Sequence, residues 1–315
     1  MSLILGIDPC KNITPPTYLS FFTASSSILI SIVASVGNFL VVIAVIWNPY
    51  KDLRTPFNYF IANLSFADLV VGLVLGPLSA IIHIFEGLDM QKQFQPFREA
   101  FHVVFFTFCT ASLLSLTALA LDRYLAVMYP LSYRTNLNPV RALLISLLLW
   151  IVSILLSMIY FIVGYNRYCF IFANTAVAVT IIELIFTNVK IQKHLRKQMQ
   201  QWETLHGSTE ENLIMKQLMM WEKKMTKTLV IVMLLFLAFY LPLYVFICII
   251  NLCTDCDCMF IHWISDIQFL LVVATSAVNP FVYAWRLESY RRVFRSIVTC
   301  SKCMSVLNHN DYQPF

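Results

Sequence analysis

Three acidic residues interrupt long apolar stretches of this 315-residue sequence: Asp68, Glu183 and Asp266. A carboxylate in an apolar environment is costly unless a cation, a proton or hydrogen-bond donors compensate its charge. Asp68 lies in the middle of its stretch, so we interpret it as a candidate cation site. A protonated or hydrogen-bonded Asp68 with a structural role is the alternative. Oxygen-bearing side chains at comparable depth in other stretches could complete the site: Asn38, Ser112, Ser276 and Asn279.

A charged triplet, Asp122-Arg123-Tyr124, closes the third apolar stretch. Arg123 can pair with Asp122 or with Glu222, which precedes the sixth stretch. Such a pair would hold the ends of two helices together, and its rupture would let them separate, which describes a two-state element. An arginine that reaches from the apolar boundary toward water is the alternative.

The sixth and seventh apolar stretches contain Pro242 and Pro280, respectively. Proline removes a backbone hydrogen bond and kinks a helix, and the neighbouring Asn279 can satisfy a freed backbone group. Kinks at matching depths are hinge candidates, although each could be only a packed bend. Aromatic side chains accompany both prolines: Phe236, Phe239 and Tyr240 near the first, and Tyr283 near the second.

The composition excludes a soluble protein. Apolar residues make up 59% of the chain and charged residues 12%, against roughly 45–50% and about 25% in ordinary globular proteins. No basic stripe alternates with aromatic residues, so the net charge of +5 does not indicate a nucleic-acid partner. No nucleophile–base pair, phosphate-binding loop or metal-ligand spacing points to catalysis, and we expect no enzyme and no cofactor beyond an ion at Asp68.

Charged residues divide the sequence into seven stretches that are long enough to cross a membrane as helices. Because each stretch is nearly continuously apolar, helices are favoured over the alternating strands of a barrel. The sequence therefore predicts an all-α membrane protein, a bundle of seven transmembrane helices. The uncharged or nearly uncharged stretches are 12–50, 55–85, 100–121, 142–166, 168–189, 228–254 and 258–285.

Basic residues lie mainly in one set of loops, which predicts the orientation. With the N-terminus outside, only four of the 22 Lys and Arg residues fall outside and 18 fall inside, as the positive-inside rule requires. The sequon Asn12-Ile13-Thr14 then lies outside, where Asn12 can be glycosylated. The polar segment 190–227 lies inside and has no proline, so we expect the fifth and sixth helices to extend into the cytoplasm.

The C-terminal part resembles a helix on the inner leaflet. Residues 287–299 place apolar side chains on one face and Arg291, Arg292 and Arg295 on the other, a pattern typical of a short amphipathic eighth helix. Cys300 and Cys303 follow as candidates for palmitoylation or as ordinary thiols. The expected organisation is an extracellular N-terminus (1–21), a transmembrane domain (22–286), the amphipathic helix (287–299) and a cytoplasmic tail (300–315).

Six motifs, in this order, resemble those of the rhodopsin-like (class A) G-protein-coupled receptors. They are Gly37-Asn38, Leu64-x-x-x-Asp68, Asp122-Arg123-Tyr124, Trp150, Phe236-x-x-Phe239-x-x-Pro242 and Asn279-Pro280-x-x-Tyr283. By this resemblance, Asp68 would hold an allosteric sodium ion with Asn38, Ser112, Ser276 and Asn279. The activation switch would comprise Asp122, Arg123, Tyr124, Glu222, Phe236, Tyr240, Pro242, Asn279, Pro280 and Tyr283, with Arg123 contacting the G protein.

The departures from the family pattern narrow the resemblance. Arg98 occupies the position of the usual cysteine at the outer end of the third helix, although Cys169 remains as a disulfide candidate. The second outer loop, 164–169, is very short, the fifth helix lacks its common proline, and Tyr240 replaces the usual tryptophan. These features resemble the branch of melanocortin, cannabinoid, lysophospholipid and adenosine receptors. The acidic cluster of melanocortin receptors is missing, so we do not expect this protein to bind the melanocortin ligand.

Further disulfide candidates lie near the outer ends of the first and last spans: Cys10, Cys253, Cys256 and Cys258. In an oxidising exterior these thiols pair with one another more readily than they bind zinc. The connectivity cannot be read from the sequence.

Residues expected to line a pocket indicate the ligand. Phe105 stands where amine receptors carry a carboxylate, and the absence of lysine between Lys227 and Lys302 argues against a retinal Schiff base. An aromatic floor with a basic rim favours a lipid with an anionic head, or a peptide with an acidic or amidated end. The expected ligand-binding residues are Arg98, His102, Phe105, Phe106, Cys109, Tyr244, Asp266 and Phe269.

The leading hypothesis is a plasma-membrane receptor that transmits ligand binding to heterotrimeric G proteins. Its other partners would be membrane lipid and arrestin, although the tail offers arrestin few serines and threonines. Two alternatives remain: a seven-helix transporter or channel, and an orphan heterodimer partner that does not signal alone.

Overall fold

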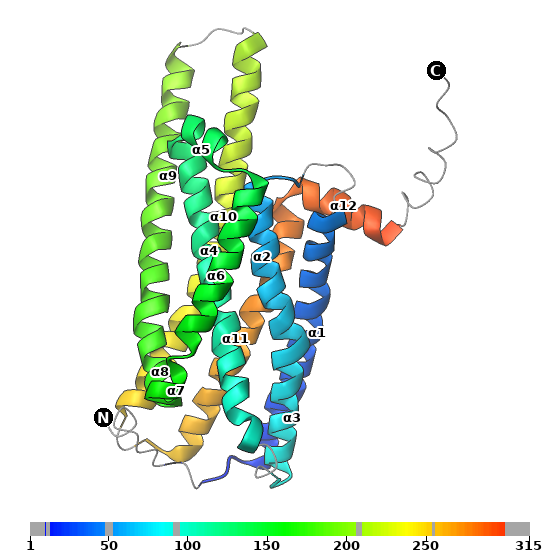
Figure 1. Cartoon of the computed structure of the whole chain (residues 1–315), viewed down its shortest axis with the longest axis vertical. Coiled ribbons are helices and arrows are strands. Elements are labelled where there is room, and N and C mark those ends of the chain that lie inside the picture. The colour runs from blue at the N-terminus through cyan, green and yellow to red at the C-terminus, as the bar shows by residue number, and fades with distance from the viewer. Residues whose placement is uncertain are drawn as a thin grey trace.

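The computed structural model describes residues 10, 13–47, 53–90, 95–205, 210–253 and 256–299. Seven helices in this part of the chain are long and apolar enough to cross a membrane, which confirms the predicted fold class. They run side by side as one bundle (Figure 1). No strand occurs among these residues.

The first three spans are α1 (Thr17–Trp47), the continuous run of α2 (Pro56–Val70), η1 (Val71–Leu75) and α3 (Gly76–Gly87), and α4 (Arg98–Met128). The fourth is α6 (Pro139–Ser157), extended by α7 (Tyr160–Val163). The fifth joins α8 (Tyr165–Phe172), η4 (Ala173–Val177) and α9 (Ala178–Leu205), and the last two are α10 (Glu210–Leu252) and α11 (Cys258–Arg286). Three short elements complete the fold: η3 (Gln95–Phe97), α5 (Pro130–Asn136) and α12 (Glu288–Thr299).

Local sequence signals explain where several helices begin. Thr55 and Asn138 each cap a helix, because their side-chain oxygens accept hydrogen bonds from backbone N–H groups of the first turn, and a proline follows each cap. Asp257 caps α11 by accepting from the N–H of Met259 at 3.4 Å. The first helix begins at Thr17, five residues before the start of the transmembrane domain expected from the sequence.

Two spans contain a π-helical turn, which shifts the rotational register of all residues beyond it. The η1 turn lies just before Pro77, whose ring nitrogen cannot donate the usual hydrogen bond. The η4 turn lies in the fifth span, which has no proline. Both turns therefore rotate one end of a span relative to its other end.

The bundle buries small residues and exposes large apolar ones, as expected for a protein whose surroundings are lipid. On α6, the buried residues are small or polar: Ala142, Ser146, Ser153 and Ser157. The leucines on its outer face are between 57% and 64% exposed: Leu143, Leu144, Leu147, Leu148 and Leu155. Glycine at position 72 allows α1 to approach the second span, since a Cβ there would lie 2.8 Å from the backbone nitrogen of Ser35.

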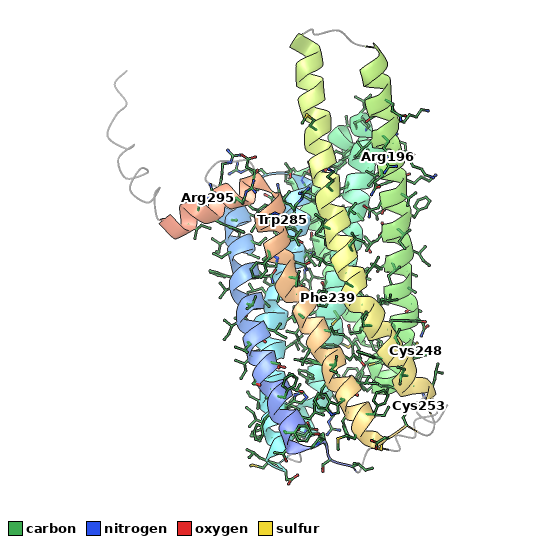
Figure 2. The ribbon with its side chains drawn as sticks, turned by 180° about the vertical axis from the view of Figure 1, so that it is seen from behind. Arg196, Phe239, Cys248, Cys253, Trp285 and Arg295 are labelled. Atoms are coloured by element: carbon green, nitrogen blue, oxygen red, sulfur yellow. A yellow bond between two sulfur atoms is a disulfide. The ribbon has the colours of Figure 1, made fainter. Side chains whose placement is uncertain are left out.

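The two ends of the bundle differ. Cys253 lies at one end, and Trp285, Arg295 and α12 lie at the other (Figure 2); we call these the disulfide end and the α12 end. At the α12 end, α9 and α10 project beyond the other spans, as predicted from the polar segment between them (Figure 1). The helix α12 packs its Leu287, Tyr290 and Val293 against the bundle.

Two disulfides lie at the disulfide end. Cys10 pairs with Cys258 at the start of α11, and Cys253 pairs with Cys256 in the connection between α10 and α11. Cys169 is a buried free thiol, so its prediction as a disulfide partner is wrong. The reason is that the cysteine usually found at the start of the third span is replaced by Arg98. Asn12, Cys300 and Cys303 lie outside the described residues.

We expect that a Cys10→Ser substitution lowers the thermal stability of the purified protein. The Cys10–Cys258 bond closes a loop with a sequence separation of 248, and disulfides of this kind typically stabilise by about 2–4 kcal/mol. The apparent Tm should therefore fall by several degrees. Cys248→Ser, which removes a free thiol, should leave the Tm close to that of the wild type. An unchanged Tm for Cys10→Ser would show that the N-terminal segment contributes nothing to stability.

Candidate functional site

A buried carboxylate joins three spans at the centre of the bundle. Asp68 on α2 is only 1% exposed. Its Oδ1 accepts hydrogen bonds from Ser276 Oγ at 2.8 Å and from Ser112 Oγ at 3.3 Å. Its Oδ2 accepts one from Asn279 Nδ2 at 2.8 Å. Three of the four residues that the sequence grouped with Asp68 therefore contact it directly, from α4 and α11.

Asn38 on α1 completes this group indirectly. Its Nδ2 donates to the backbone oxygens of Ala34 and Ser276, each at 2.9 Å. Its Oδ1 is buried and accepts no hydrogen bond from the described residues. The group thus gathers one carboxylate, two hydroxyls and an unused amide oxygen, and oxygen ligands of this kind suit a hard cation such as sodium. We call Asn38, Asp68, Ser112, Ser276 and Asn279 the polar hub.

A second polar contact beside the hub was missed by the sequence analysis. Asn63 Nδ2 donates to Ser115 Oγ at 2.7 Å, and Trp150 Nε1 donates to Asn63 Oδ1 at 2.9 Å. These bonds tie α2 to α4 and α6. The available signal was an asparagine inside an apolar stretch, five residues before Asp68, because buried amides need partners.

At the α12 end, Arg123 is held by its neighbour in sequence. Its Nε and Nη2 donate to Asp122 Oδ2 at 2.8 and 2.6 Å, and both residues are buried. Tyr133 on α5 donates to Asp122 Oδ1 at 2.8 Å and accepts from Arg123 Nη2 at 3.2 Å. The guanidinium carbon also lies 4.5 Å from the centre of the Phe57 ring. These contacts fix the arginine at the junction of α2, α4 and α5.

Tyr133 was not predicted as part of this group, because its role depends on the fold of α5. Burial raises the pKa of its hydroxyl, so the group stays protonated and remains a hydrogen-bond donor. The alternative partner Glu222 lies on α10, but its side chain is outside the described residues. Of the two predicted partners of Arg123, the structure therefore describes Asp122 alone.

The other predicted switch residues lie along α10 and α11. Phe236 and Tyr240 stack with ring centroids 4.2 Å apart, one turn before Pro242. Pro280 lies inside α11, where its ring is 3.0 Å from the Cβ position of Gly37 on α1. Tyr283 is fully buried, and its ring centroid lies 6.2 Å from that of Tyr290 on α12. Tyr124 packs with Val127, Ile191 and Leu195 between α4 and α9.

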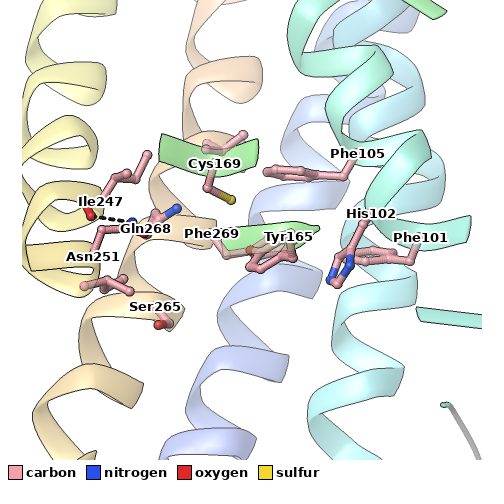
Figure 3. Close-up of a pocket in the computed structure, with 12 residues that line it drawn as sticks. Phe101, His102, Phe105, Tyr165, Cys169, Ile247, Asn251, Ser265, Gln268 and Phe269 are labelled. Atoms are coloured by element: carbon pink, nitrogen blue, oxygen red, sulfur yellow. Dashed lines mark hydrogen bonds between the residues drawn. The ribbon is translucent and has the colours of Figure 1, made fainter. Parts of the chain in front are cut away.

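An aromatic cavity lies between α4, α8, α10 and α11 (Figure 3). Its volume is about 640 Å³, including the part that is open to solvent. Aromatic rings form one side, and the amides of Asn251 and Gln268 lie on the other (Figure 3). The lining residues that carry its chemistry are Phe101, His102, Phe105, Phe269, Asn251 and Gln268.

The predicted ligand-binding residues are only partly brought together. His102, Phe105 and Phe269 line the cavity, whereas five others are not among its described lining residues. Phe106 packs into a separate aromatic cluster, Cys109 lies in the core, Tyr244 donates to Asn174, Asp266 contacts Thr23 and His83, and Arg98 is exposed at the start of α4. The reason is rotational, because neighbouring positions on a helix face different directions.

An aromatic cluster connects α4 to α7 and α8, where the usual disulfide of the family is absent. The His102 ring stacks on Tyr165 at 4.2 Å between centroids, and its Nδ1 lies 3.0 Å from Tyr160 Oη. Phe106 packs edge-on against Tyr168 at 4.4 Å. Gly164, at φ 80°, provides the one-residue turn into α8. Of this cluster, His102 and Tyr165 also line the cavity.

Comparison with known proteins identifies the family. The family model for the 7 transmembrane receptor (rhodopsin family) matches residues 37–283. The chain belongs to this family. Similar curated proteins include the adenosine receptor A2b of Gallus gallus (26% identical; 88% of each chain), the trace amine-associated receptor 9 of Mus musculus (29%; 85% of this chain and 82% of the relative) and the octopamine receptor beta-2R of Chilo suppressalis (24%; 88% and 79%).

Family membership settles the general activity. The protein is a multi-pass membrane receptor of the rhodopsin-like class, related to adenosine receptors. It takes an extracellular ligand and couples to G proteins, and it is not an enzyme. The polar hub, the Arg123 contacts and the aromatic cavity are therefore parts of a signalling receptor.

We predict that Asp122→Asn raises basal G-protein nucleotide exchange. The substitution keeps the size of the side chain but removes the negative charge that pairs with Arg123, so the guanidinium donates to a neutral amide oxygen and is held less strongly. If the Arg123–Asp122 pair is weakened by about 1 kcal/mol, the population of receptors in which Arg123 is released rises about fivefold. Exchange is measured on the purified receptor with its G protein.

Tyr133→Phe serves as the matched control for this prediction. It leaves the Arg123–Asp122 pair in place and removes only one hydroxyl, so the increase in exchange should be smaller. Exchange by Asp122→Asn at or below the wild-type rate would show that this pair does not restrain the receptor.

Proposed function

We propose that the protein is a plasma-membrane receptor whose aromatic cavity faces outward and binds a small, largely apolar ligand with a neutral or anionic polar end. The observation that carries this proposal is the chemistry of the cavity. Its described lining residues include aromatic rings, two amides and an imidazole, but no carboxylate. A cationic amine in this cavity would lack the charge partner that a buried cation requires.

Two observations support the orientation with the N-terminus outside. The basic residues gather in the loops of the α12 end, as the positive-inside rule requires. The disulfides Cys10–Cys258 and Cys253–Cys256 both lie at the opposite end, and disulfides persist in an oxidising exterior. Charge and redox chemistry thus favour the same orientation, with the cavity reached from outside and Arg123 near the cytoplasm.

The relatives do not assign the ligand. Their names refer to adenosine, octopamine and trace amines, and these ligands differ in charge. Asp266 is the nearest predicted carboxylate, but it accepts a hydrogen bond from Thr23 at 2.7 Å and lies 3.4 Å from His83, away from the cavity. A lipid, or another ligand with an apolar body, fits the rings of Phe101, Phe105 and Phe269 better than an amine does.

A continuous helix links the cavity to the rest of the receptor. Phe269 on α11 lines the cavity, and Ser276 and Asn279 on the same helix belong to the polar hub. A ligand seated against Phe269 can favour one position of α11, and that position changes the contacts of Asp68. Ligand binding then shifts the receptor between two states because its affinity for them differs.

A ligand screen tests this function. Lipids, nucleosides, peptides and amines are added to cells that express the receptor, and nucleotide exchange is read through several G-protein families. We expect a response to a neutral or anionic apolar ligand, reduced by Phe269→Ala and abolished by Arg123→Ala at near-normal surface expression. Arg141→Ala, an exposed arginine at the same end, should respond normally. A receptor that responds only to amines would contradict the proposed ligand class.

We also propose that the polar hub binds sodium. The oxygens of Asp68, Ser112 and Ser276, together with the unused Oδ1 of Asn38, would hold the ion, which supplies the positive charge that the buried carboxylate lacks among its described contacts. The hydroxyls of Ser112 and Ser276 can rotate so that their oxygens face the ion instead of donating to Asp68. Asn279 can remain bonded to the other carboxylate oxygen.

For the sodium site, we predict that the wild-type receptor has a higher apparent Tm in sodium chloride than in the chloride of a bulky organic cation, because a ligand of the folded state stabilises it. Asp68→Asn removes the charge and should abolish the difference. Glu183→Gln removes another buried carboxyl group outside the hub and should preserve it. Equal Tm values for the wild type in the two salts would exclude the ion site.

A further inference from the structure

A second group of ionisable side chains lies at the disulfide end, apart from the aromatic cavity. It joins α1, α3 and α11, and none of its members is among the described lining residues of the cavity. The His83 and Asp266 side chains, at its centre, are each 14% exposed. We call this group the outer cluster; it comprises Ser20, Thr23, His83, Glu86 and Asp266.

Both ring nitrogens of His83 face hydrogen-bond acceptors. Nδ1 lies 2.8 Å from the backbone oxygen of Ser79, one turn earlier on α3. Nε2 lies 3.4 Å from Asp266 Oδ1 on α11. A backbone oxygen can only accept, so Nδ1 carries a proton. In a neutral ring Nε2 would then present its lone pair to a carboxylate, which is repulsive.

The other neutral tautomer does not resolve this conflict. With the proton on Nε2, Nδ1 could accept from Ser79 Oγ, which lies 3.2 Å away. The lone pair of Nδ1 would then face the closer backbone oxygen at 2.8 Å. Only the doubly protonated imidazolium donates to both acceptors. With Asp266 ionised, these distances therefore fit a protonated His83 paired with the Asp266 carboxylate.

The groups around His83 favour the added proton. From α1, Thr23 donates to Asp266 Oδ2 at 2.7 Å and Ser20 donates to Glu86 Oε2 at 3.1 Å. Both hydroxyls donate, so both acids act as acceptors. On α3 itself, Glu86 adds a second negative charge that interacts with His83. Without a proton on His83, this cluster would contain two carboxylates close to a neutral ring.

Three other charged groups described near this end, His262, Arg98 and Glu99, contact other groups. His262 on α11 lies near Glu86, but its Nε2 is 2.9 Å from the backbone oxygen of Ile13. On α4, Arg98 interacts with His102, and Glu99 interacts with Tyr160. No other cation in the part of the chain that the structure describes forms an ion pair with Asp266.

We propose that His83 is an extracellular proton-binding site, and that its proton closes a contact between α3 and α11 through which external pH controls the receptor. The effect of external pH on G-protein signalling rests on the proposed orientation and function. The contact between His83 and Asp266 is independent of both. Histidine is the side chain that ordinarily exchanges its proton between about pH 5 and pH 8. The added proton lies on Nε2 of His83 and is donated in a hydrogen bond to Oδ1 of Asp266.

The contact can reach the signalling machinery because Asp266 lies on α11, the helix that carries the polar-hub residues Ser276 and Asn279. Asp266 and Ser276 are ten residues apart on α11, or about 15 Å at 1.5 Å per residue. The helix α1 packs against both α3 and α11, and Thr23 donates to the same carboxylate. Loss of the proton would leave Asp266 held by Thr23 alone and free the outer end of α11 from α3.

Thermal stability tests the contact without any ligand or G protein. The proton binds the folded contact, so the stabilisation is present at low pH and lost as the pH rises. The wild-type receptor in lipid nanodiscs should have an apparent Tm higher by about 2 °C or more at pH 6 than at pH 8, as expected for about 1 kcal/mol in a chain of this size. His83→Gln and Asp266→Asn should each reduce this difference to near zero.

Matched variants separate the contact from a general effect of acid. His262→Gln removes a histidine at the same end and should keep most of the pH dependence. The exchange variant His83→Asp with Asp266→His restores an acid–histidine pair in reversed order, so it should regain the dependence even if the single variants fold poorly. A wild-type Tm that does not change with pH, or a dependence that survives in both single variants, would overturn the proposal.

Coupling to output is tested in cells with the external buffer changed and the cytoplasm left at its own pH. Nucleotide exchange by the wild type should differ by about threefold or more between pH 6 and pH 8, because about 1 kcal/mol shifts a two-state ratio by a factor near five. His83→Gln should remove the difference and His262→Gln should retain it.

The two measurements separate two failures. Suppose that the Tm depends on pH but that no nucleotide exchange occurs at either pH with any ligand of the panel. That result contradicts the proposed signalling function and leaves the His83–Asp266 contact intact. A receptor that signals equally at both pH values, with a pH-dependent Tm, overturns the coupling of the contact to output.

Discussion

The structure depends on how the carboxylate of Asp68 is compensated inside the membrane. An isolated charge at this depth would be prohibitive, and the described contacts supply three hydrogen-bond donors and no cationic side chain. Those donors come from α4 and α11, so the compensation of one charge fixes the relative positions of three spans. A change in any of these helices must therefore change the environment of Asp68, which is why this group can act as a switch.

The positions of the spans and of the polar hub could be predicted from the sequence because they depend on depth alone. Charged residues delimit each apolar stretch, and membrane thickness fixes how much of it is a helix. Asp68, Ser112, Ser276 and Asn279 could be grouped by their comparable depth and by the family motifs in their helices, and the structure places them in direct contact. The Arg123–Asp122 pair was predictable for a similar reason, since its members are adjacent in sequence.

The cavity was less predictable because it depends on the rotation of each helix. One residue changes the direction of a side chain by about 100°, so Phe105 lines the cavity while Phe106 packs among Tyr160 and Tyr168. The turn η4 adds a further rotation between Cys169 and the rest of the fifth span. This span has no proline from which the turn could have been predicted. Asp266 was expected at the cavity because its depth was correct, but its carboxylate turns toward α1 and α3.

The helix α11 explains how groups so far apart can belong to one mechanism. It carries Asp266 near one end, Phe269 at the cavity, Ser276 and Asn279 at the hub and Tyr283 beyond them. A helix transmits displacement along its axis better than it transmits bending, and Pro280 weakens it at one point. Pro280 packs closely against α1 at Gly37, because a Cβ at position 37 would lie only 3.0 Å from the proline ring. A displacement of α11 between Asp266 and Pro280 would therefore reach the contacts that Ser276 and Asn279 make with Asp68.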